Sequence, residues 1–136
     1  MDLPDLSPEL DPTSLSVARY PAGWWPTAPI RGFCGLVFDD DEVTVVAPEE
    51  AFAQLDAPDS LEPGWRRITF AGPLPWEMVG FLADVADRLA GARIPFTSMS
   101  GFTTDHVLVR SAQAEVAVAV LRGGQPPDLR RDVTNP

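Results

Sequence analysis

The most regular pattern in this sequence lies between residues 75 and 90. Apolar residues recur there at i, i+3, i+4, i+7 and i+11, and most charged residues fall elsewhere; the apolar positions are Met78, Phe81, Leu82, Val85 and Leu89. This spacing places the apolar side chains on one face of an α-helix. Gly91 follows the last of them, and glycine is typical of a helix end. The pattern predicts an amphipathic helix that buries one face.

Short β-prone segments surround this helix. A Gly-Pro pair at 72–73 ends the alternating segment that precedes it, and a Gly-Gly pair at 123–124 ends the alanine-rich segment near the C-terminus. Alanine favours helix, so the alanine-rich segment is interpreted as helical even though it partly alternates. The second half of the chain therefore predicts strand, helix, strand, strand and helix, at residues 66–71, 75–90, 94–100, 106–110 and 112–122.

The first half predicts a similar order with weaker helices. Residues 15–20 alternate as a half-buried strand does, and two β-prone runs flank the acidic residues 39–42. These acidic residues suit a hairpin tip, because the glycine and the spaced ligands of a calcium loop are missing. Residues 22–30 contain two prolines and can hold a helical turn at most, whereas Pro48 opens a short helix. The predicted hairpin strands are 32–38 and 43–47.

The same element order thus occurs twice, although no residue-level repeat is visible. A unit of about 60 residues buries little surface alone, which predicts that the two units pack into one body. We expect a disordered arm at 1–13, a degenerate N-terminal unit at 14–64, a C-terminal unit at 65–123 and a flexible tail at 124–136. The C-terminal unit lacks a closing strand, and we hypothesise that residues 15–20 fill that edge.

Composition excludes several classes of partner. The 20 acidic residues outnumber the 10 lysines and arginines, and a net charge of -10 repels a nucleic-acid backbone. No segment approaches the about 18 apolar residues of a membrane span, and the N-terminus lacks the pattern of a signal peptide. One cysteine and one histidine cannot provide a disulfide or a structural zinc site. We expect a cytoplasmic protein without metal or cofactor.

Two segments resemble a known family. Residues 72–83 (GPLPWEMVGFLA) and 98–109 (SMSGFTTDHVLV) resemble tandem ACT proteins, which are related to the regulatory regions of aspartate kinase and to cytosolic arginine sensors. The resemblance covers residues 15–122. It implies an α+β fold of two ferredoxin-like βαββα units, each with an antiparallel sheet and helices packed on one face.

The resemblance also implies an amino-acid site at the interface of two ACT units. Two walls are implied, one formed by Leu74, Pro75, Met78 and Val79, the other by Gly101, Phe102, Thr103, Thr104 and Asp105. Met78 stands where the arginine sensors have an acidic residue, which argues against arginine as the ligand. A homodimer and a separate regulated protein fit this class.

The chemistry of these residues suits an amino acid. Backbone N–H groups at the start of the 75–90 helix could receive a carboxylate, and Asp105 could pair with an ammonium. Structural roles compete with these: the Gly-Pro pair at 72–73 also ends a strand, Asp105 also suits a turn, and Phe102 and Met78 also suit a core. Trp24 and Trp25 could cap a ligand or a dimer surface, or pack under the proline-containing loop.

Catalysis is not expected. Asp105, His106, Ser98 and Ser100 have the residue types of a catalytic triad, but neighbours on a strand point to opposite faces, so Asp105 cannot easily orient His106. No phosphate loop or dinucleotide fingerprint is present. We therefore expect a non-catalytic regulatory protein that binds an amino acid. The alternative is an interaction or oligomerisation module without a small-molecule ligand.

Overall fold

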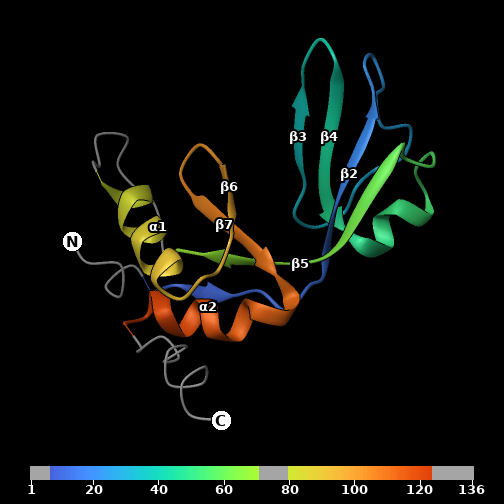
Figure 1. The fold of residues 1–136 in the computed structure, drawn as a ribbon. Coiled ribbons are helices and arrows are strands. Elements are labelled where there is room, and N and C mark those ends of the chain that lie inside the picture. Colours follow the sequence, from blue (N-terminus) through green and yellow to red (C-terminus); the bar gives the residue numbers. More distant parts are fainter. Residues whose placement is uncertain (1–6, 71–79, 124–136) are drawn as a thin grey trace. The chain divides into compact units, whose positions relative to one another are not determined.

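The computed structural model describes residues 7–70 and 80–123 (Figure 1). The chain divides into two compact units. The central unit is Asp11–Arg67, and the C-terminal unit combines Met1–Leu10 with Ile68–Pro136. The division falls inside strand β5 (Ser60–Thr69), so this strand contributes to both units. The sequence predicts the boundary slightly earlier, at the proline- and glycine-containing segment that ends at residue 64.

The central unit is an antiparallel sheet with little helix. Its sheet order is β3-β4-β2-β5, which places the unit's first strand between its third and fourth. The strand at 15–20 and the hairpin around residues 39–42 are confirmed, as is a short helix after Pro48. The elements are β2 (Leu15–Pro21), β3 (Gly35–Phe38), β4 (Glu42–Pro48), the 3-10 helix η2 (Glu49–Ala53) and the first part of β5.

Strand β5 corrects the interpretation of Pro63 and Gly64 as the end of a boundary segment between the two units. Leu15 pairs with Trp65 and Val17 pairs with Glu62, so β5 has one extra residue opposite β2. Such an insertion is a β-bulge, and Gly64 has the positive φ, 83°, that glycine adopts readily. Proline has no N–H to contribute to the ladder, which a bulge tolerates. The two residues interrupt the strand without ending it.

The C-terminal unit has the same strand order with two α-helices. Its sheet order is β6-β7-β5-β1, so β1 takes the place that β5 takes in the central unit. The described elements are β1 (Glu9–Leu10), the end of β5, α1 (Phe81–Gly91), β6 (Thr97–Ser100), β7 (Asp105–Arg110), the 3-10 helix η3 (Ser111–Gln113) and α2 (Ala114–Leu121). The predicted strands at 94–100 and 106–110 and the final helix are confirmed; β6 and α2 are shorter than predicted, and β7 begins one residue earlier.

Strand β1 overturns two expectations about the N-terminal half. Residues 9 and 10 form β1, where Glu9 pairs with Thr69 and Leu10 pairs with Ile68. Residues 15–20 do not close the C-terminal unit, because β2 pairs with β4 and with the first part of β5. Tertiary contacts outweigh the polar, proline-rich composition here: Leu10 packs against the core, and the Pro8 carbonyl accepts a hydrogen bond from Arg122 Nε at 2.8 Å.

The described part of α1 begins later than the predicted helix. Gly80 has φ 88° and accepts the first helical hydrogen bond, from the Asp84 N–H at 2.9 Å. A residue with left-handed φ cannot lie inside an α-helix, so α1 begins after it. The predicted helical residues 75–79 lie outside the described residues. Val85 and Leu89 are fully buried as predicted, whereas Leu82 is 46% exposed.

The end of α1 also differs from the prediction. The helix includes Gly91, and Arg93 adopts the left-handed conformation at φ 59°. The Ile94 N–H then donates to the Leu89 carbonyl at 2.9 Å, and the Arg93 N–H donates to the Ala90 carbonyl at 2.9 Å. This is the Schellman arrangement, with arginine where glycine is usual.

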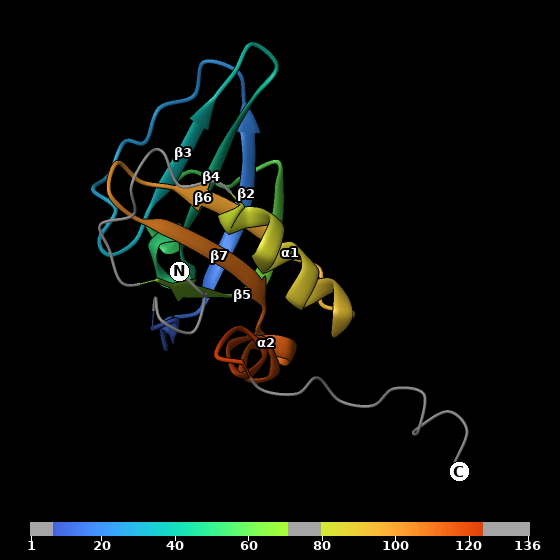
Figure 2. The ribbon, with the colours of Figure 1, turned by 90° about the vertical axis from the view of Figure 1, so that its left-hand side faces the viewer.

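Each unit has its own apolar core. In the C-terminal unit α1 and α2, whose ribbons Figure 2 shows, contribute buried residues that pack with residues of β7, with the end of β5 and with Phe70 after it. The core includes Ile68, Phe70, Val85, Leu89, Val107, Val109, Ala117, Val118 and Leu121. In the central unit the core is smaller, and the loop at residues 22–34 and η2 cover it. That core consists of Ala18, Tyr20, Val43, Val45 and Ala47, with Trp24, Ile30, Cys34, Leu36, Ala51 and Phe52 packed against it.

Candidate ligand-binding site

The β6–β7 hairpin carries all the predicted site residues that the structure describes. Ser100 and Asp105 pair across the hairpin, and the Ser100 hydroxyl donates to Asp105 Oδ1 at 2.5 Å. The Gly101 N–H donates to the Thr104 carbonyl at 2.7 Å, which closes the turn. The Asp105 carboxylate is thereby fixed at the start of β7, partly exposed. A carboxylate held in this way can still accept hydrogen bonds from an ammonium group.

Gly101 is constrained by the turn. A Cβ added at this position would lie 3.0 Å from Thr104 Oγ1 and 3.5 Å from the Thr104 carbonyl oxygen. The close approach explains why a residue without a side chain suits the hairpin here. Phe102 is 81% exposed and Thr103 is exposed, so neither belongs to the core. The competing interpretation of Phe102 as a core residue is wrong.

The side chains of Asp105 and His106 have different neighbours in the hairpin. Thr104 Oγ1 lies 3.1 Å from His106 Nε2, whereas the Ser100 hydroxyl orients the Asp105 carboxylate. Consecutive residues of a strand point to opposite faces, which accounts for the separation. A catalytic triad needs the acid to orient the base, and these contacts give that arrangement no support.

The first predicted wall cannot be placed. Leu74, Pro75, Met78 and Val79 lie outside the described residues. The described helix begins at Phe81, so its first N–H groups follow Gly80. The turn at 74–76, where a carboxylate site was expected, also lies outside the described residues. The structure brings together Gly101, Phe102, Thr103, Thr104 and Asp105 in one hairpin.

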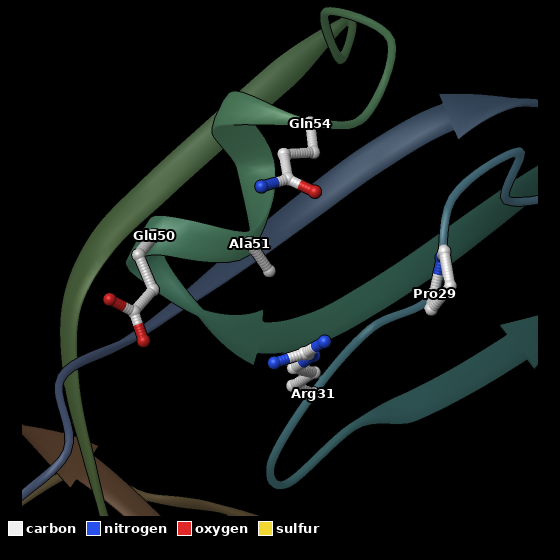
Figure 3. A pocket seen from close by; sticks show the side chains of 5 residues that line it. All are labelled: Pro29, Arg31, Glu50, Ala51 and Gln54. Atoms are coloured by element: carbon white, nitrogen blue, oxygen red, sulfur yellow. The ribbon is translucent and has the colours of Figure 1, made fainter.

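A hollow in the central unit was not predicted from the sequence. This pocket of about 430 Å³ is lined by Pro29, Arg31, Glu50, Ala51 and Gln54, which come from the 22–34 loop and from η2 with its C-cap (Figure 3). The sequence offers one weak signal: Arg31 and Glu50 have opposite charges and lie in two short segments that contain or follow proline. Because these segments lie almost 20 residues apart in the chain, no periodicity associates them.

Two further hollows adjoin the same loop. One of about 250 Å³ also has Arg31 and Glu50 in its lining, together with the Asp11–Arg67 ion pair, whose atoms Oδ2 and Nη2 are 3.3 Å apart. The other, of about 440 Å³, is lined by Pro29 and by Trp25, Ile30, Cys34 and Leu36 among others. The loop thus borders both polar and apolar concave surfaces.

Burial perturbs the acidity of two side chains in the core of the central unit. It raises the pKa of the Tyr20 phenol, and the nearby Asp56 charge adds to the effect. Burial also raises the pKa of the Cys34 thiol, which disfavours the reactive thiolate. Trp24 stacks on Tyr20 at 3.7 Å between ring centroids and donates from Nε1 to Asp56 Oδ2 at 2.8 Å. These contacts favour the packing role for Trp24.

The described residues contain no cluster of three or more histidine, cysteine or acidic side chains that could hold a metal ion. Within residues 7–70 and 80–123, no helix is both long and apolar enough to cross a membrane.

Comparison with known proteins gives a family match in the C-terminal part of the chain. Residues 60–123 match the family model of the ACT domain, and this span runs from β5 through α2. It includes the hairpin with Gly101 and Asp105. No curated protein matches the chain. This match supports the ACT resemblance for residues 60–123.

Solved structures resemble the chain over most of its length. Protein Atu0741 from Agobacterium tumefaciens is 28% identical with a TM-score of 0.72, over 85% of this chain and 86% of that chain. Protein VC0802 from Vibrio cholerae is 24% identical with a TM-score of 0.64, over 88% and 89%. The regulatory subunit of aspartate kinase from Thermus thermophilus is 12% identical with a TM-score of 0.60, over 86% and 95%. The last two likenesses establish a shared fold.

Proposed function

We propose that this chain is a non-catalytic regulatory protein that binds an amino acid or a related metabolite through its ACT domain. The observation that carries the proposal is the β6–β7 hairpin, where the Ser100 hydroxyl fixes the partly exposed Asp105 carboxylate within the span that matches the ACT family. Because this carboxylate is already oriented before the ligand binds, less conformational entropy is lost when it pairs with an ammonium group.

The proposal includes a tandem arrangement. The central unit is a degenerate ACT unit, and the ligand lies between two ACT units, with Leu74, Pro75, Met78 and Val79 on one wall and Gly101, Phe102, Thr103, Thr104 and Asp105 on the other. The similar strand order supports this: β2 lies between β4 and β5 in the central unit, and β5 lies between β7 and β1 in the C-terminal unit. Likeness to a regulatory subunit of aspartate kinase over most of both chains adds support.

Thermal unfolding of the full chain against each of the protein amino acids at millimolar concentration tests the proposal. A ligand present at about 100 times its dissociation constant adds about 2.7 kcal/mol to the free energy of unfolding. For a domain of this size the transition midpoint then rises by several degrees. We expect one amino acid or a small group of similar ones to produce this rise.

The variant Asp105→Asn locates the effect. Asparagine keeps the size of the side chain and an acceptor for Ser100, but it removes the charge that an ammonium requires. We expect the ligand-induced rise to disappear in Asp105→Asn and to persist in Asp87→Asn, which makes the same change of charge at an exposed position of α1. An equal rise in both variants would remove Asp105 from the site.

A second candidate function, an interaction or oligomerisation module, has one specific observation in its favour. Strand β3 is the last strand of the central unit's sheet, and Val37 and Phe38 on it are 51% and 45% exposed. Trp25 is 68% exposed and stacks on Phe38 at 5.2 Å between centroids. An apolar edge strand favours pairing with another chain.

Sedimentation as a function of concentration separates the two candidates. A module of this kind associates with or without amino acids, and Phe38→Lys weakens that association by placing a charge on the edge. Association that depends on an amino acid and on Asp105 favours the sensor. Wild-type protein that stays monomeric at all concentrations would exclude homo-oligomerisation through β3.

A further inference from the structure

We propose that the central unit holds a second, separate site for a small zwitterion, in the pocket between the 22–34 loop and η2. The ligand is an α-amino acid with an uncharged side chain, whose carboxylate contacts Arg31 and whose ammonium contacts Glu50. This site shares no residue with the hairpin at 101–105, so the two proposals can be tested independently of each other.

The charges of the pocket are available to a ligand. Arg31 comes from the loop and Glu50 from the first turn of η2, as Figure 3 shows, and both side chains line the same hollow. No ion pair joins the two within the part of the chain that the structure describes, whereas Arg67–Asp11 and Arg88–Asp84 do form ion pairs there. A guanidinium and a carboxylate facing one hollow without contacting each other match the two charged ends of a zwitterion.

Gly32, the neighbour of Arg31, passes close to the start of η2. Gly32 has φ 84°, and a Cβ added there would lie 3.3 Å from Pro48 Cγ. The loop therefore passes close to the residue that precedes η2, in a conformation that glycine adopts readily. This close approach holds Arg31 beside the helix that carries Glu50.

The opposite wall is anchored as well. The Glu49 N–H donates to the Ser14 carbonyl at 3.0 Å, and Glu49 Oε1 accepts a hydrogen bond from the Gly64 N–H at 3.1 Å. These bonds tie the start of η2 to the chain before β2 and to the bulge of β5. Glu50 follows directly, so its backbone is held before any ligand binds.

The remaining lining sets the class of side chain. Pro29 and Ala51 are apolar, and Gln54 offers an amide that donates and accepts. Arg31 and Glu50 are the charged residues of the lining, and the main-chain groups of the ligand occupy both. A charged side chain would be left without a partner, which disfavours its binding. The pocket volume of about 430 Å³ accommodates a free amino acid together with water.

The test is a titration of the ¹⁵N-labelled full chain, followed by two-dimensional NMR, with L-glutamine, L-serine and L-leucine up to millimolar concentration. We expect at least one of them to shift the amide signals of Arg31, Ala51 and Gln54 in a saturable way. Glutaramate lacks the ammonium of L-glutamine and 4-aminobutanamide lacks its carboxylate, so each should bind at least about tenfold more weakly than L-glutamine.

Matched variants identify the charges. Arg31→Gln and Glu50→Gln remove one charge each from exposed side chains, so the fold is retained, which circular dichroism verifies. Each should weaken binding by about tenfold or more, whereas Arg19→Gln, an equal change at an exposed position of β2, should not. Asp105→Asn should leave these shifts unchanged.

Two results would overturn the proposal. One is the absence of saturable shifts at Arg31, Ala51 and Gln54 with all three amino acids, including the case in which only residues 101–105 respond, which would support the hairpin site alone. The other is an unchanged affinity in Arg31→Gln and Glu50→Gln.

Discussion

In the C-terminal unit two α-helices cover the sheet, whereas in the central unit a proline-containing loop and a 3-10 helix do so. Both units order their strands in the same way. The helices of the C-terminal unit bury a continuous set of aliphatic residues, and the loop of the central unit leaves hollows of about 250 to 440 Å³ along its course. The same strand arrangement can thus support a dense core or a set of concave surfaces, depending on what packs on it.

Replacing a core residue of the C-terminal unit should cause the largest loss of stability. Leu89 on α1 is fully buried, and Leu89→Ala should lower the free energy of unfolding by about 2 to 5 kcal/mol because it removes buried methyl groups and leaves a cavity. Urea unfolding followed by circular dichroism measures the loss. Leu82→Ala on the same helix, at a position 46% exposed, is the control and should cost far less. Equal costs would mean that α1 does not hold the core as described.

Gly64→Ala tests the bulge through which the central unit pairs β2 with β5. The added methyl group meets no atom within 4 Å, so the cost comes from the backbone alone, at φ 83°. We expect a loss of about 1 kcal/mol in the free energy of unfolding. A neutral or stabilising effect in urea unfolding would show that Gly64 is an ordinary strand residue.

Tyr20→Phe probes the polar contacts that support the covering loop of the central unit. The Tyr20 hydroxyl donates to the Asp56 carbonyl at 2.8 Å, and its loss should cost about 1 kcal/mol at neutral pH. Because burial and the Asp56 charge raise the pKa of Tyr20 above its ordinary value of 10.0, its contribution is complete below that pH. It is lost as pH rises through the raised pKa.

Alkaline unfolding of the wild type and of Tyr20→Phe checks this sign. The stability of the wild type should fall more steeply than that of the variant as pH rises beyond 10.0, so that the two curves converge. Parallel curves over this range would remove Tyr20 as the titrating group.

Gly91→Ala should have the smallest effect and the opposite sign. Gly91 lies in the last turn of α1 without a positive φ, and an added methyl group meets no atom within 4 Å. Alanine in a helix is favoured over glycine by up to about 1 kcal/mol, so the variant should unfold at a slightly higher urea concentration. Loss of stability would mean that Gly91 ends the helix, as its place in the sequence indicates.

The hairpin at 101–105 could be predicted closely because its signals are local. The acidic, threonine- and glycine-containing turn lies between two β-prone runs, and the structure places Gly101, Thr104 and Asp105 in that turn. The same holds for α2 and for the hairpin at the acidic tip 39–42, where Asp39 Oδ1 accepts hydrogen bonds from the N–H groups of Asp41 and Glu42, both at 2.8 Å.

Other features depended on partners distant in the chain. Pro63 and Gly64 indicate a boundary between units in sequence, and only the pairing of β5 with β2 shows that they form a bulge. In the sequence Arg31 and Glu50 look like ordinary surface charges. In the structure Gly32 lies close to Pro48, and Arg31 and Glu50 line the same pocket. Neither effect has a periodicity or composition that a single sequence displays.

The sequence by itself determined most of the strands and helices, the acidic character of the chain and the ACT resemblance of its C-terminal half, because spacing, breakers and charge act locally. The tertiary structure decided which segment closes the C-terminal sheet: Glu9 and Leu10 pair with the end of β5, and residues 15–20 do not. Which strands pair depends on the packing of the whole core and on hydrogen bonds between segments that are distant in the chain. Glu9 and Leu10 pair with residues 68 and 69 of β5, next to the buried Pro8, whose carbonyl accepts a hydrogen bond from Arg122, whereas the longer β2 pairs with residues 60–65.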